Sequence, residues 1–490
     1  MLPSKPMHSM IEVLANHANT QPDILYGVDK DGPVTYGEAL LNVCRVMTAF
    51  RAAGLHAGDC VAVECSQNLR FLLTELACEW LGLIFVPVER QAAPERIQDI
   101  LTESEARLYV YFSKPVEQIP SMEMSALFDA EPTEELPDFP KGDEIAEILF
   151  STGTTGKSKG IEITHRNDIA LAENIYYGAE QKDGNVEIIP LPLSHSHALR
   201  CAYSNLLGGN TVIILDGLLN MKRFFGMMEE YHVTAIDLSP SAAQILMKLS
   251  KNRLRDYAQQ LDYVEVGTAF LPEETKDQLI DLLPGVRLYN FYGSTEAGRN
   301  CVLDFQAVRG RPGCIGKPAK NAQIIFVDEE HHEITTSPDQ LGLLAVYGSM
   351  NMRGYLKQPE LTASVLQNGW LFTSDLGYID GEGYVYVLGR AGDVINFGGI
   401  KISPEEIEEV VCKYPAVKDC ACVPKKDDIA GQVPKLFVSL KEGVPFDMAD
   451  LQKYLWEHLD NNKQPKEVAV IDEIPRTFNG KLQRGKLVEK

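Results

Sequence analysis

The chain has 490 residues, 45% of them apolar, which is enough for two or more domains with large cores. Its formal net charge of −23 argues against nucleic acid and anionic membranes as partners, because both favour basic surfaces. No stretch of about eighteen consecutive apolar residues is present, the N-terminus lacks the apolar core of a signal peptide, and the ten cysteines are scattered. We therefore expect a cytoplasmic protein without a membrane span and with reduced, buried thiols.

The first part of the chain alternates helical and strand patterns. We expect helices from Ser9 to His17 and after Val34, a buried strand at 60–64, a helix from Phe71 to Leu83 and another strand at 84–88. Such alternation is typical of a parallel sheet. The acidic, proline-rich connection at 131–140 predicts a subdomain boundary near residue 140.

The most distinctive stretch of the sequence is 149–160, where glycines, hydroxyls and lysines are concentrated. Glycines let the backbone approach an anion and lysines add positive charge, so the stretch predicts a phosphate-binding loop. Its spacing is not the Walker pattern, and the alternation at 161–164 predicts that the loop joins two strands. A surface hairpin is the alternative for a Gly-rich loop taken alone. The candidate phosphate ligands are Ser151, Thr152, Gly153, Thr154, Thr155, Gly156 and Lys159.

This stretch, with Gly160, resembles the phosphate-loop signature of adenylate-forming enzymes, the superfamily of acyl-CoA synthetases, peptide-synthetase adenylation domains and firefly luciferase. Ser158 stands where that family usually has proline. Four further motifs follow in the family's order, so the resemblance covers the chain from about Thr35 to Arg484. It is strongest to an AMP-forming acyl-CoA ligase.

The resemblance implies an α/β fold with two domains. A large N-terminal domain at 1–390 would consist of two helix-flanked β-sheets (subdomains at about 1–140 and 141–301) and a distorted β-barrel at 302–390. A small, mobile α/β domain at 391–490 would follow. Within it, Ser403 and Pro404 predict a helix start, with serine as the cap and proline at the first helical position.

Two segments are candidates for the acyl pocket. One contains His195, which matches a family histidine, and the other contains Gly267, Thr268 and Ala269. We expect His195 and His197 to share one face of a strand. A metal pair there is disfavoured, because zinc sites normally need three or four ligands.

These two segments do not identify the carboxylic acid that is the substrate. No acidic residue lies between Pro190 and Asn210, which weakens an α-amino acid as substrate. Arg200 or Arg299 could pair with a second carboxylate of the substrate, but we expect an exposed surface arginine at each position.

The segment 289–296 predicts a strand that ends in a polar loop, the place where ligands collect in open α/β sheets. The resemblance implies that Tyr292 stacks on adenine, Thr295 binds a phosphate oxygen and Glu296 holds Mg²⁺. The chemistry agrees, because a hard cation takes oxygen ligands and an aromatic face suits a purine.

Four later residues match further family positions. Asp375, in a motif with Ser374 in place of the usual glycine, would bind the ribose hydroxyls, and Arg390 would contact the nucleotide. Gly392 occupies the hinge position, normally aspartate or lysine, about which the small domain turns. Lys481, after the tight Asn479-Gly480 turn, would be the catalytic lysine of adenylation, and the loop 398–404 would face the active site during thioester formation.

These motifs predict ATP-dependent activation of a small carboxylic acid. The first half-reaction would give acyl-AMP and pyrophosphate with Mg²⁺, and the second would transfer the acyl group to the thiol of CoA. Two alternatives stay open: a stand-alone adenylation enzyme that loads the phosphopantetheine of a carrier protein, and a non-catalytic nucleotide-binding module.

Overall fold

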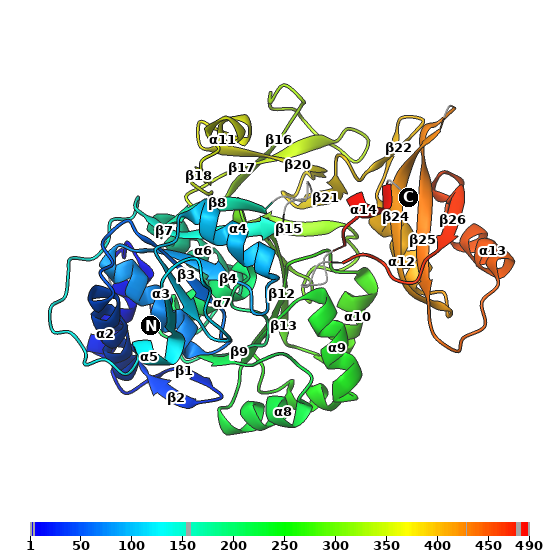
Figure 1. Cartoon of the computed structure of the whole chain (residues 1–490). Coiled ribbons are helices and arrows are strands. Elements are labelled where there is room, and N and C mark those ends of the chain that lie inside the picture. Colours follow the sequence, from blue (N-terminus) through cyan, green and yellow to red (C-terminus); the bar gives the residue numbers. More distant parts are fainter. Residues whose placement is uncertain (1, 3–4, 153–157, 428, 477–481, 489–490) are drawn as a thin grey trace. The chain divides into compact units, whose positions relative to one another are not determined.

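The computed structural model describes the chain except for residues 1, 3–4, 153–157, 428, 477–481 and 489–490. It divides into two compact units (Figure 1). The larger unit comprises residues 1–311, 315–324 and 346–371, and the second comprises 312–314, 325–345 and 372–490. The predicted ligands Gly153, Thr154, Thr155 and Gly156 and the predicted catalytic Lys481 lie outside the described residues, and of Ser151 and Thr152 only the backbone is described.

The first sheet of the larger unit has seven strands: β3 (Cys60–Glu64), β4 (Ile84–Val88), β5 (Leu108–Tyr111), β6 (Ser121–Glu123), β7 (Ile145–Thr152), β8 (Ser158–Thr164) and β18 (Gly354–Tyr355). Their order is β18-β8-β7-β4-β3-β5-β6. The pairs from β7 to β6 are parallel, and β8 is antiparallel to both β7 and β18. This agrees with the parallel sheet predicted for the first part of the chain.

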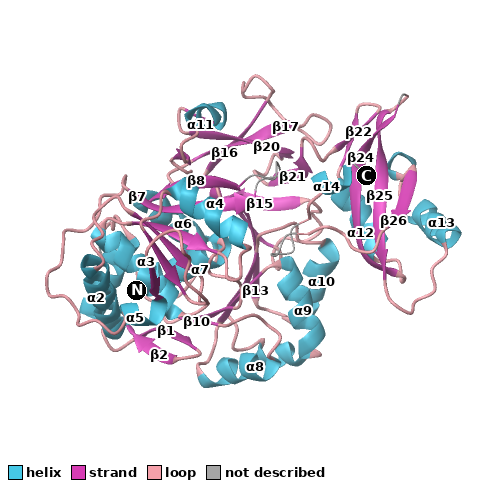
Figure 2. Ribbon diagram, viewed as in Figure 1, coloured by secondary structure: helices cyan, strands magenta, loops and turns pink. Residues whose placement is uncertain are grey.

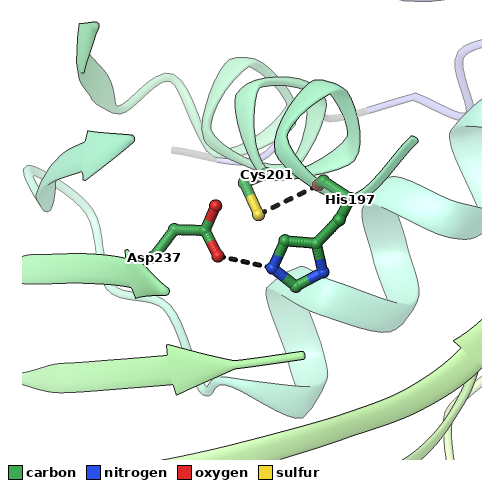
Figure 3. A group of neighbouring side chains, drawn as sticks. All are labelled: His197, Cys201 and Asp237. Atoms are coloured by element: carbon green, nitrogen blue, oxygen red, sulfur yellow. Dashed lines mark hydrogen bonds and ion pairs between the residues drawn. The ribbon is translucent and has the colours of Figure 1, made fainter. Parts of the chain in front are cut away.

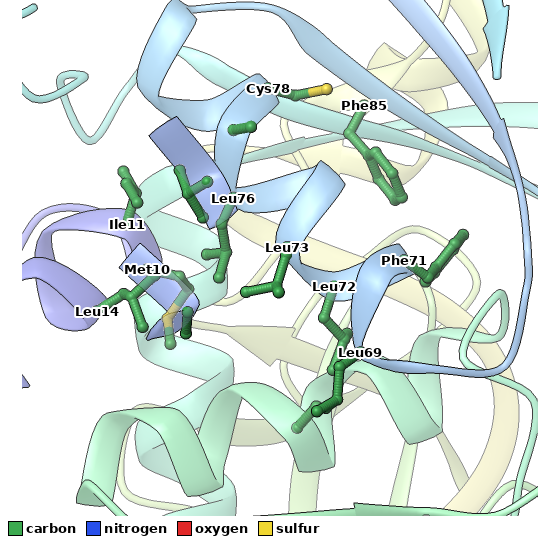
Figure 4. Close-up of a cluster of buried hydrophobic side chains, with 14 of the residues drawn as sticks. Met10, Ile11, Leu14, Leu69, Phe71, Leu72, Leu73, Leu76, Cys78 and Phe85 are labelled. Atoms are coloured by element: carbon green, nitrogen blue, oxygen red, sulfur yellow. The ribbon is translucent and has the colours of Figure 1, made fainter. Parts of the chain in front are cut away.

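Both faces of this sheet are buried, because alternate residues of its strands enter different cores. Val61 and Val63 of β3 belong to a cluster formed mainly with helices α1, α2 and α3 (Met10–Thr20, Tyr36–Ala52 and Leu69–Leu81), part of which Figure 4 shows. Cys60 and Ala62 point to the other face and pack near Ile100 of α4 (Pro94–Ser104). The sheet is therefore a rigid support for the loops at its strand ends.

In the second sheet of the larger unit the strands follow the order β15-β14-β13-β12-β11-β9-β10-β1-β2. The run from β13 to β1 is parallel, whereas β2, β14 and β15 are added antiparallel. Its strands are β1 (Leu25–Asp29), β2 (Gly32–Thr35), β9 (Val186–Ile189), β10 (Thr211–Ile214), β11 (Ala235–Leu238), β12 (Tyr263–Val266), β13 (Arg287–Ser294), β14 (Gly298–Asp304) and β15 (Cys314–Pro318).

The remaining helices lie around these sheets, as Figure 2 shows. They are α5 (Met124–Leu127), α6 (His165–Gly178), α7 (Ser196–Gly208), α8 (Met221–Glu230), α9 (Pro240–Ser250), α10 (Glu273–Leu282) and α11 (Pro359–Val365), with a 3₁₀ turn at Arg253–Tyr257. Local signals set several starts. At α2, the Thr35 side chain accepts from the amide of Glu38 while the Glu38 carboxylate accepts from that of Thr35.

Besides β15 and β18, the predicted barrel region at 302–390 contains β16 (Gln323–Val327), β17 (Gly342–Tyr347), β19 (Leu366–Gln367), β20 (Trp370–Ile379) and β21 (Val385–Arg390). Residues 302–390 are divided between the two units. Strands β20 and β21 form an antiparallel pair, closed at its turn by a hydrogen bond from the amide of Asp380 to the carbonyl of Tyr384. The sequence Asp380-Gly381-Glu382-Gly383-Tyr384 is typical of such a hairpin turn.

The C-terminal part of the second unit is a small α/β structure. Strands β22 (Ile395–Phe397), β23 (Ile400–Ile402), β24 (Val417–Asp427), β25 (Gly431–Leu440) and β26 (Glu467–Val470) form one sheet, accompanied by α12 (Pro404–Cys412), α13 (Met448–His458), a 3₁₀ turn at Asn461–Lys463 and α14 (Gly485–Val488). Helix α12 begins where predicted, but the Ser403 hydroxyl donates to Glu405 at 2.8 Å and makes no side-chain cap bond. The capping prediction was correct in position and wrong in its hydrogen bond.

The predicted fold class is confirmed: the chain is α/β, with two helix-flanked sheets in the large N-terminal part and a smaller α/β C-terminal part. The domain boundary at 390 stays a prediction. None of the helices in the described part of the chain combines the length and apolar character that a bilayer crossing requires. All ten cysteines are free thiols and nine are buried, but Cys412 is exposed, contrary to the expectation of buried thiols throughout.

Candidate functional site

The predicted phosphate loop is held between paired strands. Strands β7 and β8 are antiparallel neighbours, with Ser151 opposite Lys159 and Thr152 opposite Ser158. The prediction that the loop joins two strands is therefore correct, and both of its ends belong to the seven-stranded sheet.

The segment 352–356 fastens this strand pair to the predicted Thr295–Glu296 turn. The amide of Met352 donates to the carbonyl of Glu296 at 2.8 Å, and Tyr355 pairs with Ile161 of β8. The amide of Leu356 donates to the carbonyl of Gly160 at 2.8 Å. One short stretch of backbone thus fixes two predicted motifs relative to each other.

Tyr355 connects the side chains of the same two motifs. Its hydroxyl donates to Glu296 Oε1 at 3.1 Å, and the ammonium of Lys159 lies 5.3 Å from the centre of its ring. The structure therefore brings Lys159 and Glu296 into contact with the same tyrosine, Lys159 with its ring and Glu296 with its hydroxyl. Tyr355 was not predicted as a site residue, because a single tyrosine in a two-residue strand carries no sequence pattern.

The other residues of the turn lie at the end of β13, as predicted. Tyr292 and Thr295 are partly buried, and Tyr292 is opposite Cys301 of β14. The amide of Ala297 donates to the hydroxyl of Ser294 at 3.1 Å, which closes the turn after the strand. This places an aromatic ring, a hydroxyl and a carboxylate within five residues at one strand end.

Asp375 and Arg390 lie together in the second unit. They are directly opposite in the β20–β21 pair, with Arg390 Nε 3.9 Å from Asp375 Oδ1. Gly392 follows in an exposed turn, and a side chain there would meet nothing within 4 Å. Its φ is outside the left-handed range, so this conformation does not itself require glycine.

The predicted strand around His195 and His197 is wrong. His195 is the N-cap of α7, its Nδ1 accepting from the amide of His197 at 3.2 Å, and His197 is in the first helical turn. The alternating Ser-His-Ser-His pattern resembles a strand in sequence, but here it begins a helix. The two imidazoles therefore do not lie on one face of a strand.

His197 instead forms a buried polar cluster with Cys201 of its own helix and with residues of three sheet strands, of which Figure 3 shows His197, Cys201 and Asp237. Its Nε2 donates to Asp237 Oδ1 at 2.6 Å, and its Nδ1 accepts from Arg299 at 2.9 Å. Because arginine can only donate, Nε2 carries the imidazole proton. Arg299 also donates to the Cys201 thiol at 2.8 Å and forms an ion pair with Glu265.

This cluster touches the candidate acyl pocket. A Cβ at Gly267 would lie 2.4 Å from His197 Cε1, so the imidazole occupies the space that a larger residue would need. Thr268 and Ala269 are exposed beyond it, and Thr268 has a left-handed φ of 81°. His197, Cys201 and Asp237 have the donor types of a metal site, but Arg299 already places a cation on two of them and disfavours a second.

Neither arginine considered as a substrate-binding group is on the surface. Arg299 is 6% exposed and Arg200 is 1% exposed. Arg200 forms ion pairs with Glu147 of β7 and, at 3.2 Å, with Asp168 of α6. The expectation of an exposed arginine was wrong for both residues, because each neutralises carboxylates of the chain itself.

The residues on either side of Lys481 in sequence are anchored to α12 and β24. Arg476 donates twice to Asp419, at 2.8 Å in each bond, and its backbone forms a β-bridge with Leu482. Arg484 donates to both oxygens of Glu408, at 2.8 and 2.7 Å. Burial raises the pKa of Glu408 to about 7 despite the guanidinium of Arg484.

Comparison with known proteins agrees with this arrangement of motifs. The model of the AMP-binding enzyme family matches residues 14–356, and that of the AMP-binding enzyme C-terminal domain matches residues 406–481. The chain belongs to the AMP-binding enzyme family. The family membership that the sequence motifs indicated is therefore confirmed.

Its relatives include feruloyl-CoA synthase of an Amycolatopsis species, 29% identical with 93% of each chain covered. Another is 4-coumarate–CoA ligase 3 of Arabidopsis thaliana, 26% identical with 99% of this chain and 91% of the relative covered. The crystal structure of o-succinylbenzoate CoA synthetase of Bacillus subtilis with ATP and magnesium ion has the same fold, with a TM-score of 0.88 at 24% identity over 98% of this chain and 99% of the other.

Proposed function

We propose that this family member is an AMP-forming acid–CoA ligase that activates an aryl monocarboxylic acid. The observation that carries the proposal is the Lys159–Tyr355–Glu296 connection, which ties the strand leaving the phosphate loop to the Thr-Glu turn. The family and the ligase relatives bear out the predicted activity class, an enzyme that forms acyl-AMP and then acyl-CoA. A non-catalytic module is correspondingly disfavoured.

In the first half-reaction the substrate carboxylate attacks the α-phosphate of ATP and pyrophosphate leaves. Negative charge is spread over phosphate oxygens in line, so positioning and cationic donors are the main source of catalysis. We assign this role to the loop 151–156, to Lys159 and to Lys481. Tyr355 contacts both groups, because its ring lies under the Lys159 ammonium and its hydroxyl donates to Glu296.

Glu296 offers the carboxylate oxygens that Mg²⁺ prefers, so it would hold the ion, which would neutralise phosphate charge, and the Thr295 hydroxyl would bind a phosphate oxygen. The half-buried Glu296 carboxylate is oriented by Tyr355, which supports this assignment. Tyr292 would stack on adenine. The cross-strand pair of Asp375 and Arg390 would bind the ribose hydroxyls and the nucleotide.

In the second half-reaction the thiol of CoA attacks the acyl carbon and AMP leaves. The predicted thioester loop is next to a cavity of about 350 Å³ in the second unit, whose lining includes Asn396, Gly399, Lys401 and Gln432. A cation and amide donors in one cavity suit the phosphates and amides of CoA. The same chemistry would fit the phosphopantetheine of a carrier protein, the alternative acceptor.

The acid is expected to carry one carboxylate. Arg200 and Arg299 are neutralised by Glu147, Asp168 and Glu265, so neither supplies a cation for a second carboxylate. The two ligase relatives are named for feruloyl-CoA and 4-coumarate, whose acids are aryl monocarboxylates. Gly267 leaves its space to His197, so the imidazole lies directly against this candidate segment.

The test is pyrophosphate release across a panel of acids, followed by thioester formation with CoA or with a phosphopantetheinyl carrier protein. We expect release with ferulate and 4-coumarate, little with malonate or o-succinylbenzoate, and transfer to CoA. Preference for the dicarboxylates would contradict the proposed acid class. Transfer to the carrier protein alone would contradict CoA as the acceptor.

A further inference from the structure

Two thiols of the second unit lie against each other at the end of α12. Cys412 is the last residue of that helix and is exposed, whereas Cys420 is 2% exposed in β24. Their sulfur atoms are hydrogen-bonded at 3.3 Å. A disulfide sulfur–sulfur bond is about 2 Å long, so side-chain rotation could supply much of the remaining approach.

We propose that Cys412 and Cys420 are a site of reversible oxidation, at which a peroxide converts the two thiols to a disulfide. The positions of the two sulfurs give them different roles. Cys412 is accessible to a small oxidant from solvent. Cys420 is buried in the core of the small sheet, with its sulfur in contact with that of Cys412.

The charges around the pair assign the first step to Cys412. The hydrogen bond from Cys420 lowers the pKa of Cys412, and the guanidinium of Arg476 acts in the same direction. The same hydrogen bond and burial raise the pKa of Cys420. Cys412 is therefore the more readily ionised thiol, and the thiolate is the reactive form towards peroxides.

The chemistry is balanced by the peroxide itself. The Cys412 thiolate attacks one peroxide oxygen, the oxygen–oxygen bond breaks, and the leaving oxygen takes a proton to give water or an alcohol. Cys412 becomes a sulfenic acid. The Cys420 thiol then attacks its sulfur, a disulfide forms and water leaves. A small dithiol reverses the reaction by thiol–disulfide exchange.

The pair lies where it can affect the anchoring of the segment around Lys481. Asp419, which binds Arg476, directly precedes Cys420. Cys420 Sγ also lies 3.5 Å from the backbone carbonyl of Glu408, whose carboxylate binds Arg484. Drawing the end of α12 towards β24 would shift the partners of both arginines. This consequence rests on the proposed role of Lys481 in adenylation, whereas the oxidation site does not.

The site is tested by peptide mass spectrometry of the full-length protein treated with hydrogen peroxide, without any assay of activity. Trypsin separates Cys412 in peptide 402–413 from Cys420 in peptide 419–425. We expect these peptides to be joined with the loss of two hydrogen atoms and to separate again after dithiothreitol. Cys412→Ser should abolish the link. Cys422→Ala, which removes the other cysteine of peptide 419–425, should leave it intact.

Three results would overturn the site: a link that disappears in Cys422→Ala, a link between two chains, or sulfinic acid at Cys412 without any link. The effect of the disulfide on adenylation is tested by measuring the rate of pyrophosphate release before and after treatment with peroxide. We expect this rate to fall severalfold in the wild type and to recover after dithiothreitol. The rate of Cys412→Ser should not fall. An unchanged rate in fully linked protein would contradict the coupling to Lys481, while the disulfide itself would still be detected by mass.

Discussion

The two segments predicted to act on the triphosphate are supported in different ways. Residues 153–157 are flanked by β7 and β8, whose backbone pairing continues into the sheet and is reinforced by the segment 352–356. Residues 477–481 are flanked by one β-bridge and by ion pairs of Arg476 and Arg484 with Asp419, Glu405 and Glu408. The first support is mainly backbone hydrogen bonding within a large core, and the second depends on side-chain charge.

This difference fits the different tasks proposed for the two segments. The proposed phosphate loop would need one fixed geometry during adenylation, which a sheet provides. The proposed role of Lys481 in adenylation alone would require the small C-terminal part to change its arrangement between the two steps. Charged contacts between side chains are also the kind that oxidation, pH and substitution alter most directly.

The largest effect is expected when the proposed catalytic charge itself is removed. Lys481→Ala should slow acyl-AMP formation by about 10²–10³, the usual cost of losing one preorganised donor to the transition state. Thioester formation from synthetic acyl-AMP should change far less. The two rates are measured separately, as pyrophosphate release and as consumption of added acyl-AMP. Equal losses in both would contradict a role confined to adenylation.

Removing the support of that lysine should have a smaller effect on rate and a clear effect on stability. Arg484→Ala leaves the Glu408 carboxylate, whose side chain is 15% exposed, without its principal cation. Breaking a buried pair from one side costs about 3–5 kcal/mol, so thermal unfolding of the small unit should shift to a lower temperature. Arg476→Ala is the matched control, because its pair with Asp419 is more exposed and should matter less.

The corresponding support in the larger unit is expected to depend on Tyr355. Tyr355→Phe keeps the ring beside Lys159 but removes the hydrogen bond to Glu296. Losing one hydrogen bond to a partly exposed carboxylate should slow pyrophosphate release about fivefold to tenfold. Tyr355→Ala, which also removes the ring, should be slower than Tyr355→Phe. If Tyr355→Phe matches the wild type, the hydroxyl does not orient Glu296.

Local sequence patterns predicted most elements because their causes are local. The Thr35 capping box, the buried strand at 60–64 and the turn at 380–384 depend on residues within a few positions of each other. The segment at His195 was misread because an alternating polar pattern is compatible with a strand until the cap bond is seen.

Residues whose partners lie far away in sequence could not be placed. The partners of Arg200 and Arg299 come from β7 and β12, so their burial depends on how strands are ordered in the sheets. Tyr355 could not be predicted for the same reason. Its ring contacts Lys159 and its hydroxyl binds Glu296 only when β18 is paired with β8. Asp375 and Arg390 were matched separately to the family pattern, and that they lie opposite each other is seen only in the β20–β21 register.

The smallest effect on activity is expected from the buried carboxylate of Glu79 in the larger unit. This residue tests whether the stability of the unit that contains β7 and β8 depends on pH. Glu79 of α3 is 1% exposed; one carboxylate oxygen accepts from the amide of Ile11 at 2.9 Å, and the other has no hydrogen-bond partner among the described residues. Burial raises the pKa of Glu79 from 4.5 to about 8.

Because the folded-state pKa of Glu79 is above the unfolded value, the folded chain binds more protons between these limits. The free energy of unfolding should therefore fall as pH rises from 4.5 to 8. Glu79→Gln keeps an acceptor for Ile11 and removes the titrating group. Compared with the wild type, it should melt at nearly the same temperature at pH 5 and a few degrees higher at pH 9, with pyrophosphate release little changed. Glu117→Gln, at an exposed position, should show no such pH-dependent difference. A difference between Glu79→Gln and the wild type that is the same at both pH values would contradict the raised pKa and leave only a packing effect.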